Sequence, residues 1–385
     1  MIMAGKKLKI GIIGGSIGGL VTGIALQKSG HDVTIFEKTG EKLKDRGAGI
    51  VLQQDLINFF QQYNISDIES INVPIYQRVY LDRNGSKIRI DNTEQEMTAW
   101  GTIFHKLISY FPEDQYKYGY KFTNLSQDKN QVIAEFDNGE SETFDLLIGA
   151  DGTNSTVRKS LFPQISHHYA GYVGWRGIVH ETELAPNILK EFTDRFTFYS
   201  MQNSHILCYL IPGNDDKVSV GDRRLNWVWY WNVQEGQEIN DLLTDINGVK
   251  RSGFVAEGFV KPRYIKAQKD IANQVMPSIF KELIGATTNP FIQPVNDLSV
   301  TKMYLNRVVL IGDAAFTPRP HTASSTAKAV DNGVSLCQML NEYPDDMEQA
   351  LAIWEQPQLH RGNYLKNKGI TLGNQSQFGI SSLEF

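Results

Sequence analysis

Residues 9–20 read Lys9-Ile10-Gly11-Ile12-Ile13-Gly14-Gly15-Ser16-Ile17-Gly18-Gly19-Leu20, and this stretch decides the fold. An apolar run typical of a β-strand meets a cluster of glycines, and a helical pattern of apolar residues follows at once. A dinucleotide-binding fingerprint requires a glycine for a tight turn, a small residue where backbone approaches a pyrophosphate, and a glycine where the helix packs on the strand. Gly14, Ser16 and Gly19 occupy these three places. The stretch therefore predicts a strand–turn–helix unit that binds a nucleotide.

The residues that follow support this interpretation. A second strand is predicted at 32–36, and Glu37 ends it roughly 20 residues after the first glycine, where an acid accepts hydrogen bonds from the adenosine ribose. The helix that begins at Ile17 offers free amides and a partial positive charge to the phosphates. Ser16 replaces the usual middle glycine, and its hydroxyl can itself donate to a phosphate oxygen. A glycine-rich turn in an ordinary parallel sheet is the alternative, but the complete order of elements favours the nucleotide site.

Composition excludes several classes of protein. The chain has 385 residues, of which 41% are hydrophobic and 21% charged, and its net charge of −5 gives no basic surface for nucleic acid. Cys208 and Cys337 are too few for a disulfide framework and lack metal-ligand spacing, which favours two buried thiols in a reducing compartment. No apolar run approaches the roughly 20 residues of a membrane span, and no separate signal-peptide core precedes the first strand. We expect a cytoplasmic protein without metal, membrane or nucleic-acid partners.

Nucleotide-type strands occur at the start, middle and end of the chain, with a β-rich insert over about 167–265. We therefore expect an α/β fold with an α+β insert: a Rossmann-like domain of three chain segments interwoven with a mainly antiparallel sheet domain. The expected segments are 1–70, 98–165 and 290–340 for the nucleotide domain, 71–97 and 166–289 for the β-rich domain, and 341–385 for a C-terminal helical segment. Helices are expected at 271–283, 326–340 and from 347 to about 368.

Two further motifs place an acid after a buried strand. Asp151 and Gly152 follow the strand at 143–150, with Arg158 shortly after, and Asp313-Ala314-Ala315 follows the strand at 307–311. The carboxyl ends of parallel strands form the edge at which such folds bind ligands. An aspartate that caps a helix is the alternative for Asp313.

Together and in this order, the three motifs resemble the class A flavoprotein monooxygenases, the para-hydroxybenzoate hydroxylase-like family, over nearly the whole chain. Three features resemble its 2,6-dihydroxypyridine 3-hydroxylase subgroup: Ser16 in the fingerprint, Gly171-Tyr-Val-Gly-Trp-Arg-Gly177, and Pro320-His-Thr-Ala323 leading to Thr326-Ala-Lys-Ala329. The usual family has glycines and an asparagine in that last loop. Many members also have an arginine where this chain has Trp100.

The resemblance implies non-covalent FAD and NAD(P)H as a transient co-substrate. The residues that it assigns to FAD are Gly14, Ser16, Ile17, Gly19, Glu37, Lys38, Arg46, Gly49, Asp151, Asp313, Pro320, Ser325, Thr326 and Ala327. In this assignment Glu37 contacts the adenosine ribose and Asp313 the ribityl and pyrophosphate. The loop from Pro320 to Ala327 places amides at the pyrimidine edge of the flavin. Arg46 either faces a phosphate or belongs to an exposed basic loop.

The implied reaction is hydroxylation of an aromatic or N-heterocyclic small molecule by dioxygen through a flavin 4a-hydroperoxide. No catalytic residue is assigned. His321 is the one candidate, and a histidine that fixes its loop by hydrogen bonding is the favoured alternative. Trp229, Tyr209 and His321 are candidate substrate contacts, although aromatic stripes are more often packing. An FAD-dependent dehydrogenase or oxidase, a tetracycline-type antibiotic-modifying monooxygenase and a non-catalytic flavin sensor are the rivals. A homodimer is left open.

Overall fold

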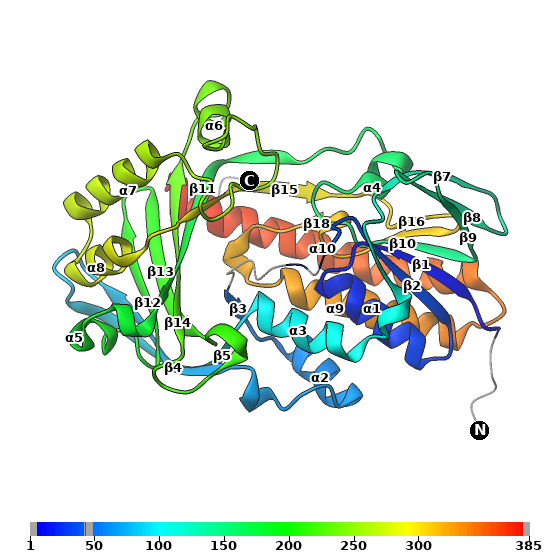
Figure 1. Ribbon diagram of the computed structural model, residues 1–385, viewed down its shortest axis with the longest axis horizontal. Coiled ribbons are helices and arrows are strands. Elements are labelled where there is room, and N and C mark those ends of the chain that lie inside the picture. Colours follow the sequence, from blue (N-terminus) through cyan, green and yellow to red (C-terminus); the bar gives the residue numbers. More distant parts are fainter. Residues whose placement is uncertain (1–5, 42, 44–48, 380–385) are drawn as a thin grey trace.

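The computed structural model describes residues 6–41, 43 and 49–379. Figure 1 shows two sheets at opposite ends of the molecule, and a long C-terminal helix that reaches both. The first sheet has six strands in the order β16-β17-β10-β1-β2-β6. Their bounds are β1 (Lys9–Ile13), β2 (Asp32–Glu37), β6 (Tyr116–Tyr118), β10 (Leu146–Gly149), β16 (Tyr304–Leu305) and β17 (Val308–Leu310). All neighbours are parallel except β16 and β17.

Helices cover this sheet, which explains why its central strands are apolar almost throughout. They are α1 (Ile17–Lys28), α2 (Gln54–Tyr63), α3 (Trp100–Tyr110), α4 (Thr156–Leu161), α9 (Ser325–Glu342) and α10 (Met347–Phe378). Helices α1 and α9 approach closely because Gly333 faces Thr22: a Cβ on Gly333 would lie 2.1 Å from the Thr22 Oγ1. The two helices therefore pack directly against each other.

The second sheet has nine strands in the order β18-β15-β11-β14-β13-β12-β4-β5-β3. Their bounds are β3 (Gly49–Val51), β4 (Val73–Leu81), β5 (Lys87–Ala99), β11 (His168–His180), β12 (Arg195–Met201), β13 (Ser204–Ile211), β14 (Arg224–Asn232), β15 (Phe291–Ser299) and β18 (Phe316–Thr317). Helices α5 (Pro186–Leu189), α7 (Pro262–Val275) and α8 (Ser278–Ala286) lie on the side away from the first sheet, and α6 (Gln237–Leu242) lies above the upper end of the nine-stranded sheet (Figure 1). A small antiparallel sheet holds β7 (Phe122–Gln127), β8 (Val132–Phe136) and β9 (Ser141–Phe144).

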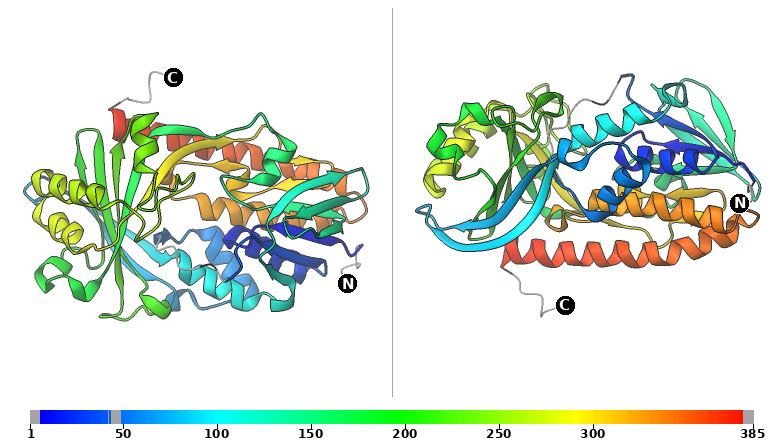
Figure 2. Two further views of the ribbon diagram at one scale, coloured as in Figure 1. Left: turned by 45° about the horizontal axis from the view of Figure 1, so that its top comes forward. Right: turned by 90° about the horizontal axis from the view of Figure 1, so that it is seen from below.

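The expected α/β architecture with its β-rich insert is confirmed, and two helix predictions differ in detail. The single helix expected at 271–283 is two helices, α7 and α8, separated at Met276 and Pro277. Pro277 lacks the N–H that would continue α7, and it stands at the N-cap of α8 instead. Helix α10 runs ten residues beyond the expected end, from Met347 to Phe378, with Pro357 inside it. Figure 2 shows it extending along most of the molecule.

The expected domain boundaries stay a prediction. Strands β3, β15 and β18 pair in the nine-stranded sheet, although they fall within the ranges 1–70 and 290–340. The chain thus crosses between the two sheets more often than the three expected nucleotide-domain ranges and two expected β-rich ranges allow. None of the helices in the described part of the chain combines the length and apolar character of a membrane span.

Candidate active site

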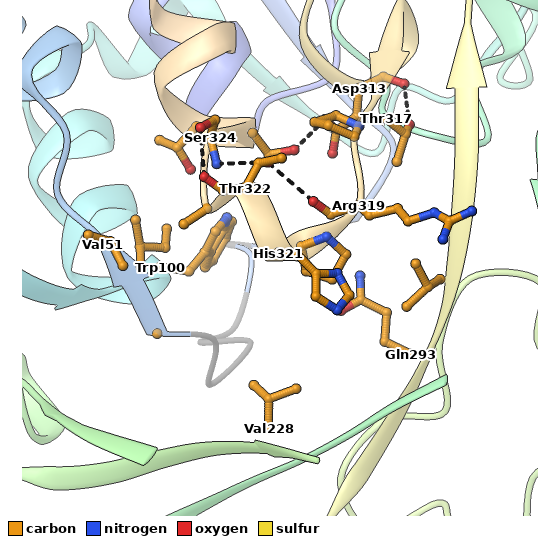
Figure 3. Close-up of a pocket in the computed structure, with 18 of the residues that line it drawn as sticks. Val51, Trp100, Val228, Gln293, Asp313, Thr317, Arg319, His321, Thr322 and Ser324 are labelled. Atoms are coloured by element: carbon orange, nitrogen blue, oxygen red, sulfur yellow. Dashed lines mark hydrogen bonds between the residues drawn. The ribbon is translucent and has the colours of Figure 1, made fainter. Parts of the chain in front are cut away.

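A cavity of about 2460 Å³ lies between the two sheets. This is more than twice the roughly 300–1,000 Å³ typical of a site for one small ligand, so it has room for a cofactor and a substrate together. One wall consists of the carboxyl ends of the parallel strands and the beginnings of α1 and α9. The other is the inner face of the nine-stranded sheet. Figure 3 shows Val228 of that sheet across the open space from His321 and Trp100.

The glycine turn brings the beginning of α1 to the cavity. Gly14 has φ +110°, and a Cβ there would lie 2.5 Å from the Ala150 carbonyl oxygen, so only glycine fits. Gly19 does not line the cavity; a Cβ on it would lie 2.0 Å from the Gly14 carbonyl oxygen, which identifies a packing position. Gly14, Ser16 and Ile17 line the cavity, and Ser16 caps no amide of α1. The amides of that helix end are therefore open to an anion.

Glu37 is buried at the end of β2 and held in place by amides. Its Oε2 accepts from the Gly15 N–H at 3.0 Å, and its Oε1 accepts from the Thr39 N–H at 3.1 Å. The neighbouring Lys38 lines the cavity, as does Gly49 on β3. Arg46 lies outside the described residues.

Asp151 follows β10 and presents an unpaired oxygen. Its Oδ2 accepts from the Thr156 N–H at 2.6 Å and the Val157 N–H at 3.2 Å, whereas its Oδ1 is buried without a partner. Burial raises the pKa of this carboxyl group. Because an unsatisfied buried oxygen is costly, the site is suited to a ligand that donates a hydrogen bond there. Arg158 links this motif to the third by donating to the Ala314 carbonyl at 2.9 Å.

Asp313 lies in the turn after β17 and accepts two bonds at its Oδ1, from the Ser325 hydroxyl and the Lys328 ammonium, both at 3.0 Å. None of the backbone N–H groups of α9 donates to Asp313, so Asp313 does not cap that helix. Lys328 is buried and also donates to the Phe316 carbonyl; burial lowers its pKa. Sequence reasoning missed Lys328, although a lysine within a run of small residues on a buried helix was a usable signal.

The loop from Pro320 to Ser325 lines the cavity at the beginning of α9, and so does Thr326. Ala327 points elsewhere and is buried. Ala323 takes the left-handed conformation with φ +50°, which glycine adopts more readily than alanine. Its carbonyl accepts from the Gln53 side chain at 2.6 Å, which ties the loop to the start of α2. The loop amides are thus fixed at one side of the cavity.

His321 faces the cavity but is engaged at both ring nitrogens. Its Nδ1 lies 3.4 Å from the Tyr172 hydroxyl, its Nε2 lies 3.3 Å from the Ser376 hydroxyl, and its ring stacks on Tyr230 at 4.7 Å. Burial, with smaller effects from His205 and Arg319, lowers the pKa of His321 to about 3. A neutral imidazole held by two partners favours the loop-fixing interpretation over a proton-transfer role.

The C-terminal helix forms part of the cavity wall, which the sequence did not reveal. Residues of its last three turns line the cavity: Lys368, Leu372, Gln375 and Ser376. Gly373 allows the helix to approach, because a Cβ there would lie 2.5 Å from the Tyr172 Oη. The α10 segment beyond the predicted end at residue 368 is thus the segment that contributes to the site.

The sheet wall corrects one substrate assignment. Tyr209 lines the cavity as expected, together with Val228 and Tyr230. Trp229 does not: side chains alternate along a strand, so it points to the opposite face, where it packs in the apolar core and donates to the Ser204 hydroxyl at 2.9 Å. In the described part of the chain, no group of three His, Cys, Asp or Glu residues could hold a metal ion.

Comparisons with known proteins agree with this geometry. A family model described as NAD(P)-binding Rossmann-like domain matches residues 12–41, and one described as FAD binding domain-like matches residues 169–297. The chain is 33% identical over 374 residues to 2,6-dihydroxypyridine 3-monooxygenase of Paenarthrobacter nicotinovorans, covering 97% of this chain and 92% of that one. The chain belongs to the class A flavoprotein monooxygenases. In this flavin monooxygenase, FAD is the cofactor and NAD(P)H the reductant.

Solved structures show the same fold. The solved 2,6-dihydroxypyridine-3-hydroxylase of Arthrobacter nicotinovorans superposes on this monooxygenase with a TM-score of 0.93 at 32% identity, over 99% of this chain and 96% of that one. Klebsiella pneumoniae HpxO, solved with FAD and uric acid, superposes with a TM-score of 0.77 at 20% identity, over 96% and 89% of the two chains. A more distant relative in sequence, 6-hydroxynicotinate 3-monooxygenase of Pseudomonas fluorescens, is 23% identical over 92% of this chain.

The residues at the first wall fit FAD. Asp151 offers a buried oxygen that lacks a donor, Gly14 leaves no room for a side chain beside Ala150, and α1 and α9 begin at the cavity without an acid in their first turns. Two helix N-termini carry partial positive charge, which suits a pyrophosphate and an electron-rich ring edge.

Proposed function

We propose that this flavin monooxygenase hydroxylates a ring carbon of a small hydroxylated pyridine or related N-heterocycle. The observation that carries the proposal is that two different walls of the cavity face each other. The three nucleotide motifs lie on one wall, and Tyr209, Tyr230 and Arg176 of the nine-stranded sheet lie on the other. A planar ring fits between such walls. The likeness to an enzyme named for 2,6-dihydroxypyridine, over nearly the whole chain, supports the same substrate class.

The FAD contacts are part of this proposal. The amides at Ser16 and Ile17 would bind the pyrophosphate, Glu37 the adenosine ribose, and Asp313 the ribityl chain, with Gly14 and Gly19 providing the close approach that these contacts need. The loop of Pro320, Ser325 and Thr326 would present amides to the pyrimidine edge. Lys38, Gly49 and Asp151 complete the set, whereas Ala327 would act only through packing.

Bound FAD supplies the activation of dioxygen, and the protein supplies position and a dry environment. Val228 and Tyr209 would contact the substrate ring on the sheet side of the cavity, so that one ring carbon faces the flavin. The buried rings of Tyr230 and Tyr209 and the side chain of Ile75 line the cavity and limit water there. His321 would fix the loop through Tyr172 and Ser376 rather than transfer a proton.

The test is turnover with identified product. The purified protein is expected to be yellow, to release FAD on denaturation, and to consume NAD(P)H faster when 2,6-dihydroxypyridine is added, with one oxygen atom gained by the substrate in mass spectra. Oxidation of the substrate without NAD(P)H consumption and without a gain of oxygen would indicate an oxidase or dehydrogenase instead. A response to tetracycline but to no pyridine would contradict the proposed substrate class.

Two finer expectations belong to the same proposal. A cytoplasmic location is supported by Cys208 and Cys337, which are both free and buried. A homodimer is tested by light scattering of the FAD-loaded protein after size exclusion.

A further inference from the structure

Helix α10 packs so closely on the loop at 319–322 that two of its positions have little room for a β-carbon. A Cβ on Gly369 would lie 3.0 Å from the Arg319 backbone nitrogen, and a Cβ on Gly373 would lie 2.8 Å from the Arg319 Nη1. Glycine weakens the interior of a helix relative to alanine, so two glycines four residues apart are expected where close packing compensates the loss. The end of α10 is therefore fitted to this loop.

Two polar side chains of the following turn bond to the same loop. The Asn374 Oδ1 accepts a hydrogen bond from the Arg319 Nη1 at 2.9 Å, and the Ser376 Oγ lies 3.3 Å from the His321 Nε2. Arg319 and His321 stand on either side of Pro320, and all three line the cavity. The bonds from α10 therefore hold the part of the loop that the proposed function places next to the flavin.

Gln377 connects the same turn to the sheet wall. Its side chain is fully buried, and its Nε2 donates to the His205 Nδ1 of β13 at 3.2 Å. Its backbone carbonyl accepts from the Asn232 Nδ2 of β14 at 2.7 Å. His205 lines the cavity, and the centre of its ring lies 5.4 Å from that of His321. One turn of one helix thus bonds to the loop on one side and to the sheet on the other.

In the proposed function the substrate ring lies between the loop and the sheet, so their separation determines how the ring faces the flavin. In coupled turnover NAD(P)H and one proton supply two electrons and two protons; one oxygen atom of dioxygen enters the substrate and the other leaves as water. In uncoupled turnover the same electrons and protons convert dioxygen to hydrogen peroxide, and the substrate is unchanged. Because a misplacement of about 1 Å can cost roughly a hundredfold in rate, a small shift of the loop against the sheet favours the second outcome.

We propose that Asn374, Ser376 and Gln377 are positioning residues, and that this turn of α10 determines how much of the turnover ends in hydroxylated product rather than hydrogen peroxide. Asn374 and Ser376 act through Arg319 and His321, and Gln377 acts through the sheet. The proposal rests on the proposed function, from which it takes the place of the flavin at the loop and of the ring at the sheet.

Paired variants test the proposal in the FAD-loaded enzyme. Asn374→Leu removes the acceptor for Arg319, and Asn374→Asp keeps it. Ser376→Ala removes the hydroxyl group, and Ser376→Thr keeps it. Asn363→Leu is the matched control, because Asn363 is exposed on α10 and its side chain bonds to the Leu359 carbonyl of its own helix.

Four quantities are measured for each variant. They are the hydroxylated product and the hydrogen peroxide formed per NAD(P)H consumed, the flavin absorbance change on adding 2,6-dihydroxypyridine without reductant, the FAD content, and the midpoint of urea unfolding. The last two report a merely structural role, and the first two report the position of the loop against the sheet.

Asn374→Leu and Ser376→Ala are expected to raise the share of NAD(P)H that ends as hydrogen peroxide about threefold or more, and to diminish the absorbance change, with FAD content within twofold. Asn374→Asp and Ser376→Thr should restore the product yield, and Asn363→Leu should match the unmodified enzyme. An unchanged product yield in both removing variants overturns the proposal. So does an equal loss in Asn363→Leu, or a loss of product that only follows a loss of FAD.

The proposed function can fail separately. If the enzyme hydroxylates a different ring and no pyridine, the same yields are measured with that ring, and this inference stands while the proposed substrate class is contradicted. If 2,6-dihydroxypyridine is hydroxylated with equal yield by the unmodified enzyme, Asn374→Leu and Ser376→Ala, the proposed function stands and this inference is contradicted.

Discussion

The guanidinium of Arg319 and the carboxylate of Asp297 form a two-point ion pair, with Nε to Oδ1 at 2.9 Å and Nη2 to Oδ2 at 2.7 Å. Arg319 belongs to the loop that leads into α9, and Asp297 to β15 of the nine-stranded sheet. A third bond, from the Arg319 Nη1 to the Asn374 Oδ1 of α10 at 2.9 Å, extends the connection. One side chain thereby joins the nucleotide wall, the sheet wall and the C-terminal helix.

Asp297→Ala should destabilise the protein by about 3 kcal/mol, because it leaves a largely buried guanidinium without its counter-charge. The measurement is urea unfolding of the FAD-saturated protein. Asp270→Ala removes the partner of Lys266 in an exposed ion pair and should cause a much smaller change. If the two variants unfold at the same urea concentration, the pair does not hold the walls together.

Asp313→Ala should reduce FAD retention, but it also leaves the buried Lys328 ammonium unpaired. The double variant Asp313→Ala/Lys328→Met separates the two effects. We expect the double variant to recover most of the stability that the single variant loses and still to retain less FAD. FAD content after gel filtration and unfolding of the apoprotein are the two measurements. Full FAD content in the double variant would contradict the proposed contact between Asp313 and the cofactor.

The parts of the site that the sequence predicted are those whose chemistry is local. A tight turn, a helix end and an acid after a strand require particular residues in a particular order, and Gly14, Glu37 and Asp313 follow that order. Arg319 was not predicted, because its role depends on partners set by tertiary contacts. The partner of Arg319 is Asp297, on a strand of the other sheet. No pattern along the chain specifies that pairing.

Trp229 illustrates a second limit. Strand β14 alternates: Leu225, Trp227 and Trp229 lie on the face that packs against α7 and α8, and Val228 and Tyr230 lie on the face that lines the cavity. The sequence contains this period of two, but it does not specify which face the helices cover. Only the packing of α7 and α8 distinguishes the face of Trp229 from the face that lines the cavity.

Acid should destabilise the folded protein through His205 and His321. Burial lowers the pKa of His205 to about 4 and that of His321 to about 3, below the value of about 6.5 in an unfolded chain. Between these values the unfolded chain binds more protons, so stability is present above pH 6.5 and is lost as pH falls toward 4. His205 alone would account for roughly 3 kcal/mol.

Urea unfolding at pH 7.5, 6.5 and 5.5 measures this slope. His205→Gln should flatten it, whatever the variant does to stability at pH 7.5, because the glutamine does not titrate. In the double variant His205→Gln/His321→Gln, the dependence of stability on pH should be flatter still. A slope that is the same in all variants would mean that other groups cause the acid sensitivity.

The two faces of β14 should respond oppositely to substitution. Val228→Phe enlarges a side chain on the cavity face, so we expect the KM for 2,6-dihydroxypyridine to rise about tenfold or more, with a small change in stability, because the ring projects into open space. Trp229→Phe removes volume and a bond to Ser204 from the core face, and it should cost about 1–3 kcal/mol of stability and leave KM within twofold. Steady-state kinetics and urea unfolding of both variants decide the matter. If Trp229→Phe raised KM and Val228→Phe did not, the substrate would lie on the other face of the sheet.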